Sequence, residues 1–328
     1  MLTAVVTGVA GQDGSYLSEL LLSKGYRVVG VARRRSANQE YLNINHLFSN
    51  DLFCFVEGDV SDPTLVSRLI HSYSPHEWYN LAAMSHVGQS FREPVATFSN
   101  NSLSVVSQLE CIRQLSPYTR FYQASTSELF GTTKCPESGF TEESVFHPRS
   151  PYGVSKLASY WAVANYREAY GLFACNGILH NHSSPRRGYG FATRKITRGI
   201  AKVSLGIEDV LRMGNLSSFR DEGHAKDYCN AMYLMLQQES PDDYLISTGS
   251  GATIEEMFRY VCSLAGLEFD DVYQMDERYM RPSDVPYLLG NPEKARIALG
   301  WEPEYDWKKL LKEMYENDLN ELKELNNV

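Results

Sequence analysis

The sequence lacks the features that mark a secreted, metal-binding or membrane-spanning protein. Its six cysteines are scattered and form no Cys-x-x-Cys pair, so we predict no metal site and no disulfide framework. We interpret them as reduced thiols of a cytoplasmic protein. No segment approaches the ~20 apolar residues that cross a bilayer, and the amino terminus has no signal-peptide pattern. The chain also has no internal repeat and no low-complexity tract.

An excess of positive charge is absent as well. The formal net charge is −9, which argues against nucleic acid or an anionic membrane as a partner. An anionic small molecule would therefore need a locally basic site.

Apolar runs alternate with amphipathic segments through the first half of the chain. The pattern predicts strands over 2–7, 26–31, 52–56, 78–82, 120–124 and 173–179. Helices are predicted over 15–24, 63–71, 95–113 and 151–170. This order indicates an α/β fold of the Rossmann type, a doubly wound parallel sheet covered on both faces. Ligands bind such sheets at the carboxyl ends of the strands.

The second half is less regular. It predicts strands over 210–213 and 242–248 and helices over 193–205, 254–265 and 307–322. We assign residues 1–178 and about 214–244 to the Rossmann domain. Residues about 179–213 and 245–328 are expected to form a smaller carboxyl-terminal α/β lobe that binds the substrate.

A glycine motif, Gly8-x-x-Gly11-x-x-Gly14, follows the first predicted strand and opens the first helix. Glycines there permit a tight turn and let the backbone approach a pyrophosphate at the helix amino terminus. The spacing is typical of extended short-chain dehydrogenases and reductases, which use a nicotinamide dinucleotide.

The end of the second strand indicates which dinucleotide binds. NAD-binding sites usually carry an acidic residue there for the ribose hydroxyl. This chain instead has a basic cluster followed by a hydroxyl: Arg33, Arg34, Arg35 and Ser36. Such a cluster suits a 2′-phosphate, so NADP is predicted as the cofactor. The alternative is a solvated basic turn.

Tyr152 and Lys156 are four residues apart at the start of a predicted helix, so they share a face. A nearby ammonium group, together with the positively charged nicotinamide of the cofactor, favours the phenolate form of a tyrosine, which otherwise has a pKa near ~10. The phenolate can then remove a hydroxyl proton while hydride leaves the same carbon.

Thr126 and Glu128 follow the fifth predicted strand. The strand period of two predicts that both point to one side, with Ser127 opposite. Thr126 can bind the oxygen that is oxidised. Glu128 can remove the proton next to the new ketone and then protonate a leaving hydroxyl. The alternative for Glu128 is an ordinary surface or capping acid.

Taken together, these motifs resemble the GDP-mannose 4,6-dehydratase family. The resemblance covers nearly the whole chain, including Thr7–Leu17, Phe121–Glu128, Pro148–Tyr152, Asn176–Leu179, Ser184–Gly188, Thr193–Lys195, Arg281–Pro282 and Leu288–Pro292. It implies conversion of GDP-mannose to GDP-4-keto-6-deoxymannose by a hydride that passes from C4 to the cofactor and returns to C6. The implied catalytic residues are Thr126, Glu128, Tyr152 and Lys156.

The resemblance also implies the binding residues. The expected cofactor set is Gly8, Gly11, Gln12, Asp13, Gly14, Arg33, Arg34, Arg35, Ser36, Asp59, Val60, Leu81, Ala82, Ala83, Tyr152, Lys156, His182 and Arg187. The expected substrate set is Ser85, Thr126, Glu128, Asn181, Lys195, Arg220, Arg281 and Asp284. Within these sets, the residues implied to hold the nucleotide diphosphate are Asn181, Arg187, Lys195, Arg220 and Arg281. A homo-oligomer, dimer or tetramer, is expected, with the loop near Arg33 reaching a neighbouring subunit's cofactor.

Two positions depart from the family motifs. The family usually reads N-H-E-S-P where this chain has Ser183, and R-D-W-G where it has Glu222. Both segments border the expected substrate site. A changed sugar pocket is one interpretation, with a GDP-linked manno-heptose as the competing substrate. A substitution without effect on the pocket is the other.

Two other functions remain open from the sequence. A sugar-nucleotide reductase or epimerase would share the cofactor site and Tyr152 but would not need Glu128. A non-catalytic NADP sensor usually lacks the tyrosine, the lysine or the glycines, and this chain retains all of them.

Overall fold

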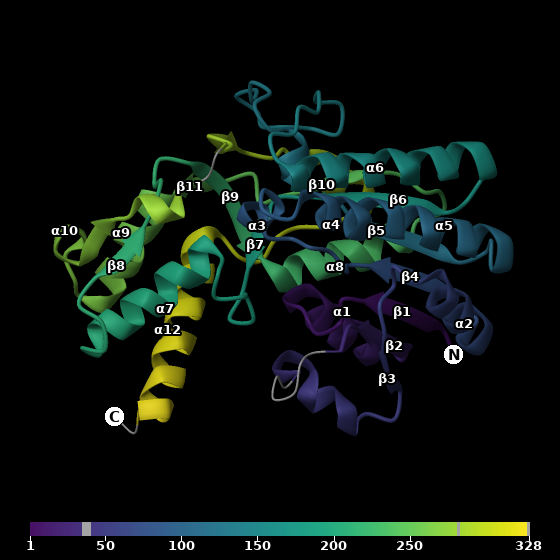
Figure 1. Cartoon of the computed structure of the whole chain (residues 1–328), viewed down its shortest axis with the longest axis horizontal. Helices are drawn as coiled ribbons and strands as arrows, with labels where there is room; N and C mark the ends of the chain where they lie inside the picture. The colour runs from purple at the N-terminus through teal and green to yellow at the C-terminus, as the bar shows by residue number, and fades with distance from the viewer. Residues whose placement is uncertain (35–40, 281–282, 327–328) are drawn as a thin grey trace.

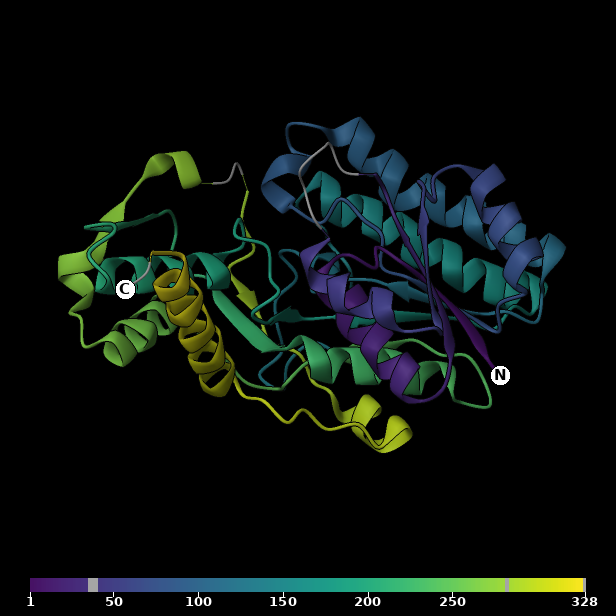
Figure 2. The same cartoon turned by 90° about the horizontal axis from the view of Figure 1, so that it is seen from below.

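The computed structural model describes residues 1–34, 41–280 and 283–326. Three predicted site residues, Arg35, Ser36 and Arg281, lie outside this part of the chain. Two lobes are visible in both views, with helices α7, α9 and α12 in the smaller one (Figures 1 and 2). No helix of the described residues is long and apolar enough to cross a membrane.

The larger lobe is built on a seven-stranded parallel sheet in the order β10-β6-β5-β4-β1-β2-β3. This confirms the predicted α/β class and the doubly wound order. The strands are β1 (Thr3–Thr7), β2 (Arg27–Ala32), β3 (Phe53–Glu57), β4 (Glu77–Asn80), β5 (Arg120–Ala124), β6 (Ala174–Leu179) and β10 (Tyr244–Ile246).

Helices cover both faces of this sheet. On one face α2 contacts α5, which contacts α6, and on the other face α1 contacts α8 (Figures 1 and 2). The bounds are α1 (Gln12–Ser23), α2 (Pro63–Tyr73), α3 (Val87–Ser90), α4 (Pro94–Phe98), α5 (Ser104–Leu115), α6 (Pro151–Tyr170) and α8 (Ala225–Leu236). Short 3₁₀ helices span Leu42–Ser49 and Ser127–Leu129, and a π-helical turn, Ser99–Leu103, joins α4 to α5.

Local sequence explains the elements that carry the site. Strand β1 is fully buried and β-branched at four of its five positions, as expected of a central parallel strand. Helix α6 begins where the Ser150 hydroxyl accepts a hydrogen bond from the Gly153 amide, with Pro151 in the first turn. It ends at Gly171, whose φ of 67° suits a left-handed cap.

In the smaller lobe, helices α7, α9 and α12 pack against one another beside two small sheets. One sheet joins β7, β9, β11 and β13, and the other joins β8 and β12. The strands are β7 (Asn181–Ser183), β8 (Leu211–Met213), β9 (Phe219–His224), β11 (Gly251–Thr253), β12 (Tyr273–Met275) and β13 (Tyr287–Leu288). The helices are α7 (Ala192–Ser204), α9 (Ile254–Ala265), α10 (Phe269–Val272), α11 (Glu293–Leu299) and α12 (Trp307–Asn326), and a 3₁₀ turn spans Glu277–Tyr279.

A buried ion pair fixes α12 on α7. Arg194 Nη2 lies 2.8 Å from Asp318 Oδ1, and the Thr197 hydroxyl donates to Asp318 Oδ2 at 2.6 Å. Both charged side chains are almost fully buried. Arg198 lies 3.4 Å from Asp318, and Glu321 lies 3.4 Å from Arg194. This ion-pair network fixes the helix that carries the cavity residues Thr193 and Lys195.

The predicted domain boundaries stay a prediction, although two strands cross them. Strand β9 falls in the segment assigned to the Rossmann domain, yet it pairs with β7, β11 and β13. Strand β10 straddles the predicted boundary at residue 244 and forms the edge of the seven-stranded sheet.

The start of α1 depends on a glycine with no room for a side chain. A Cβ at Gly14 would lie 2.5 Å from the Gly8 carbonyl oxygen and 2.6 Å from Val9 Cα. We expect Gly14→Ala to lower the free energy of unfolding by about 1–3 kcal/mol, because backbone has to move. This loss should appear although alanine is the better helix former by about 1 kcal/mol.

Urea unfolding followed by circular dichroism measures this change. Gly190→Ala is the matched control, because the nearest atom to its Cβ would be 3.6 Å away. Its effect should stay within about 0.5 kcal/mol. Equal losses in the two variants would contradict the contact as the cause.

Candidate active site

A cavity of about 1720 Å³ opens at the carboxyl ends of the parallel strands and extends to the smaller lobe. Every predicted site residue in the described part of the chain lines it. The structure therefore brings these residues together, while the individual roles stay predictions. Sequence motifs far apart along the chain converge here because parallel strands end at one edge of the sheet.

The glycine turn forms the floor of one end. Gly8 has a φ of 69°, and a Cβ there would lie 3.0 Å from the Ala82 amide nitrogen. Gly11 is the N-cap residue of α1, so it offers no side chain to the first free amide groups of the helix. Such amides form a site for an anion.

The segment after β4 lies against this turn. The Thr7 hydroxyl oxygen accepts hydrogen bonds from the amides of Leu81 and Ala82, each at 3.1 Å. Small side chains at Ala82 and Ala83 leave the cavity wall open next to the glycines.

Asp13 and His182 join the two lobes at the cavity wall. His182 Nε2 lies 2.9 Å from Asp13 Oδ2, and His182 Nδ1 lies 2.8 Å from the His180 carbonyl oxygen. Gln12 is in the same network, because its amide donates to the His182 carbonyl and its carbonyl accepts from the Ser184 hydroxyl. Both ring nitrogens face acceptors, so the imidazolium, with an N–H at each nitrogen, satisfies both contacts.

The mutual attraction of Asp13 and His182 explains the shifts of their two pKa values. Burial would raise the pKa of Asp13, but the charge and hydrogen bond of His182 hold it at about 2. Burial would lower the pKa of His182, but Asp13 outweighs it, and that pKa is raised. The pair therefore favours the ionic form, with Asp13 ionised and the His182 ring protonated more readily than an ordinary imidazole.

Arg33 and Arg34, the described part of the basic cluster, follow β2 and line the cavity together with Val60. Arg33 Nη1 is 3.9 Å from Asp59 Oδ2, and Arg34 Nε is 4.0 Å from Glu57 Oε2. The arginine side chains are 60% and 87% exposed, so these contacts are weak and both groups can reach a ligand.

Tyr152 and Lys156 lie in the first turns of α6, as predicted, and both are buried. The Lys156 ammonium donates to the Ala124 carbonyl oxygen at 2.7 Å, at the end of β5. Burial lowers the pKa of Lys156 to about 8. Burial also raises the pKa of Tyr152 to about 12, with a further rise from the charge of Glu128, while a hydrogen bond to Thr126 opposes it. The protein alone therefore holds Tyr152 as a neutral phenol.

The prediction that Thr126 and Glu128 follow the side-chain alternation of a β-strand is wrong. Strand β5 ends at Ala124, and a 3₁₀ helix begins at Ser127. Thr126 is the N-cap residue, whose hydroxyl accepts from the Glu128 amide at 3.3 Å. The strand period of two does not apply there, and Thr126, Ser127 and Glu128 all line the cavity.

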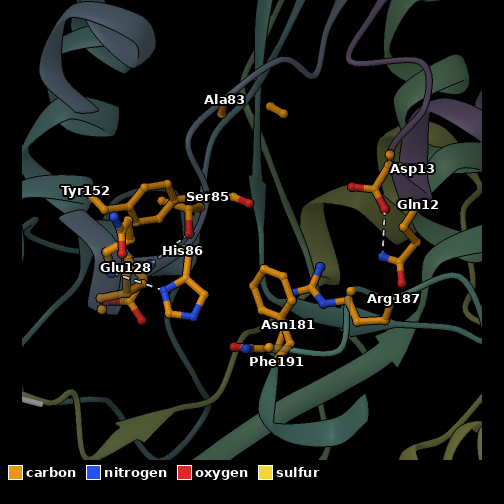
Figure 3. A pocket seen from close by; sticks show the side chains of 18 of the residues that line it. Gln12, Asp13, Ala83, Ser85, His86, Glu128, Tyr152, Asn181, Arg187 and Phe191 are labelled. Atoms are coloured by element: carbon orange, nitrogen blue, oxygen red, sulfur yellow. Dashed lines mark hydrogen bonds between the residues drawn. The ribbon is translucent and has the colours of Figure 1, made fainter. Parts of the chain in front are cut away.

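Figure 3 shows how the labelled side chains divide across the cavity. Tyr152, Ser85 and Glu128 gather on one side together with His86, and Gln12, Asp13 and Arg187 lie on the other. Asn181 and Phe191 lie between them at the lower wall. A ligand in this space contacts both groups.

The smaller lobe contributes cations that are held by rings and acids. The Arg187 guanidinium lies 3.7 Å from the Phe191 ring centre, and Lys195 Nζ lies 3.1 Å from that of Tyr279. Arg220 Nη2 is 3.4 Å from Asp284 Oδ1, so two predicted substrate residues contact each other. Burial lowers the pKa of Lys195.

Sequence reasoning missed several residues that line the cavity, and His86 and Phe191 are two aromatic examples. Their rings lie 5.9 Å apart. Neither belongs to a motif with a known chemical role, and their position depends on how α3 and α7 pack. No sequence signal could have identified them.

The Asp13–His182 pair gives a titration prediction. In Asp13→Asn the attraction for the imidazolium is lost and burial remains, so the pKa of His182 should fall below its ordinary value of 6.5. NMR titration of the His182 ring protons measures it. His180 serves as internal control, because burial lowers its pKa to about 3 and Asp13 is not among the causes. An unchanged His182 pKa in the variant would contradict the pairing.

Comparison with known proteins gives this arrangement a family. The family model described as "GDP-mannose 4,6 dehydratase" matches residues 5–314. A GDP-mannose 4,6-dehydratase of Yersinia enterocolitica is 43% identical over 99% of this chain and 95% of its own. GDP-mannose 4,6 dehydratase 2 of Arabidopsis thaliana is 46% identical over 96% of this chain and 86% of its own.

Solved structures share the fold. A dTDP-glucose 4,6-dehydratase from Bacillus anthracis in complex with NAD has a TM-score of 0.86 at 22% identity, covering 99% of this chain and 98% of that one. A UDP-glucose 4-epimerase from Thermus thermophilus in complex with NAD has a TM-score of 0.82 at 26% identity, covering 97% and 99%. With a family model that spans most of the sequence and relatives matched over nearly their whole length, this chain belongs to the GDP-mannose 4,6-dehydratase family.

Proposed function

We propose that this protein is a hydro-lyase that converts GDP-mannose to GDP-4-keto-6-deoxymannose with NADP as its bound cofactor. The observation that carries the proposal is the position of Glu128 beside Tyr152. Both line one cavity wall, and the charge of Glu128 acts on the pKa of Tyr152. Oxidation alone needs only the tyrosine, whereas elimination needs a second acid/base group.

The residues present fit a nicotinamide dinucleotide. Gly8, Gly11 and Gly14 keep side chains away from the amino terminus of α1, where a pyrophosphate would be held. Arg33 and Arg34 would contact a 2′-phosphate, and Lys156 and His182 would lie next to the nicotinamide end. When bound, the nicotinamide supplies a hydride acceptor and donor.

Tyr152 and Glu128 each carry out a different part of the proton transfer. Thr126 binds O4 of the sugar, and Tyr152, once deprotonated, takes the O4 proton. Glu128 takes the proton from C5, which the C4 ketone makes acidic, and gives it to the C6 hydroxyl, which leaves as water. The proton held by Tyr152 is then available to restore C5, so only water is lost.

Diphosphate binding is supported by the cations of the smaller lobe. The buried Arg187 Nε has no hydrogen-bond partner in the described part of the chain. Together with Lys195 and Arg220, it forms a basic wall in an acidic protein, which suits a nucleoside diphosphate. The competing substrate, a GDP-linked manno-heptose, is favoured by the unusual residues Ser183 and Glu222.

We also propose that the protein assembles as a homo-oligomer. Large apolar side chains on neighbouring helices are exposed, notably Leu103, Val106, Val154 and Trp161. These residues belong to the π-helical turn, α5 and α6, which contact each other, and an apolar surface of this kind marks an interface.

The proposal predicts one product and no net redox change. Incubation with GDP-mannose and NADP should give a product lighter by one water, seen by mass spectrometry, without accumulation of NADPH. In Glu128→Gln we expect turnover to fall by about 10²–10⁴-fold while cofactor binding is retained.

The exposed Glu137→Gln is the control variant and should match the wild type. A reductase or epimerase would give no loss of water, and near-normal turnover in Glu128→Gln would remove the elimination role from that residue.

Cofactor choice is tested by isothermal titration. We expect tighter binding of NADP than of NAD, and loss of about 10- to 100-fold in NADP affinity when Arg33 and Arg34 are both replaced by alanine. NAD affinity should change little. Arg27→Ala, at the opposite end of β2, is the control. Tighter binding of NAD by the wild type would refute the assignment.

A further inference from the structure

The two positions that depart from the family motifs contact each other. Ser183 lies on β7 and Glu222 on β9, which are parallel neighbours with Asn181 opposite Glu222 in the register. The Ser183 hydroxyl donates to Glu222 Oε1 at 2.5 Å. Two substitutions that look unrelated in the sequence are therefore one structural change.

The hydrogen bonds around this pair have a defined direction. Because the Ser183 proton is given to Glu222, Ser183 Oγ must accept from Thr193 Oγ1, which lies 2.8 Å away. Thr193 and Ser183 are both buried, and their hydrogen bonds orient the Glu222 carboxylate.

The second carboxylate oxygen is left for a ligand. Glu222 is only 3% exposed, yet it lines the cavity. Within the described residues, Oε2 of Glu222 accepts no hydrogen bond. Oε2 is not fully enclosed by protein atoms, and a donor from a molecule bound in the cavity would complete its hydrogen bonding.

The charge of the site limits what that donor can be. Burial raises the pKa of Glu222, while Ser183, Arg187, His182 and Arg220 oppose the rise. A carboxylate does not accept a hydrogen bond from an ionised diphosphate. The donors that a GDP-linked sugar can offer are the N–H groups of its base and its hydroxyl groups, of which only the hydroxyls of the sugar are absent from GDP.

We propose that Glu222 determines specificity by accepting a hydrogen bond from a hydroxyl group of the sugar, with Ser183 as its positioning residue. The carboxylate that the family motif carries on β7 is supplied in this chain by β9. The inference rests on the proposed function only in taking the ligand to be a nucleotide-linked sugar.

The test compares binding of GDP-mannose with binding of GDP. Glu222→Gln keeps an oxygen for the Ser183 hydroxyl but can place an NH₂ donor where the sugar hydroxyl needs an acceptor. We expect GDP-mannose or GDP-manno-heptose affinity to fall about 10- to 100-fold, the worth of a hydrogen bond to a charged group, with GDP affinity unchanged. The exposed Glu208→Gln should leave both affinities unchanged.

A double-mutant cycle tests the positioning role. Ser183→Ala should weaken sugar binding less than Glu222→Gln, and the double variant should be no weaker than Glu222→Gln alone. Ser183→Glu combined with Glu222→Trp, which restores the family residues, should recover GDP-mannose binding that each single change loses. Thermal unfolding checks that every variant is folded.

Equal losses for GDP and both GDP-sugars in Glu222→Gln, or no loss, would overturn the inference. That failure is separate from a failure of the proposed function, which would appear as absence of the dehydrated product from the wild type. Sugar-selective loss without dehydration would keep the inference and reject the proposed reaction.

Discussion

The ion pair of Asp13 and His182 is the constraint on which the cavity depends. Asp13 lies in the first turn of α1, and His182 lies on β7, which pairs with β9 of the smaller lobe. The pair therefore fixes the distance between the glycine turn and the strand that carries Asn181, Ser183 and, through pairing, Glu222. Gln12 adds two further bonds across the same border.

Burial sets the chemistry on the opposite side. It keeps Tyr152 protonated and lowers the pKa of Lys156 to about 8. The ordinary assumption that a lysine nearby makes the tyrosine a phenolate does not hold for the protein chain alone. A positive charge in the cavity would be the missing contribution, since Coulomb attraction is strong where water is excluded.

The sequence was sufficient to predict the bounds of those strands and helices whose burial follows from their own apolar residues. Strand β5 and helices α6 and α9 begin and end where the apolar pattern and the caps predict. Strand β9 was missed because its residues read as a charged loop. Asp221 is buried there only because distant backbone and hydroxyl donors, from Thr248 and Gly249, satisfy its carboxylate.

The residues of the candidate site also divide into those that local sequence predicts and those that depend on distant contacts. Residues in short motifs, such as Gly8 and Tyr152, were predictable because their chemistry depends on short spacing, whereas Arg187 was implied only by the family resemblance. His86, Phe191 and the contact of Ser183 with Glu222 depend on which strands pair and how helices pack. A single sequence carries no record of those pairings.

We proposed that a sugar-binding carboxylate lies on β9 in this chain and on β7 in the family motif. This exchange has a consequence for how related sequences diverge. A chain that acquires the second glutamate before losing the first must hold two like charges side by side in a buried wall. A chain that loses the first beforehand has no acceptor at all. Either order passes through a poorer ancestor, so paralogues that differ at this spot are expected to carry both exchanges or neither.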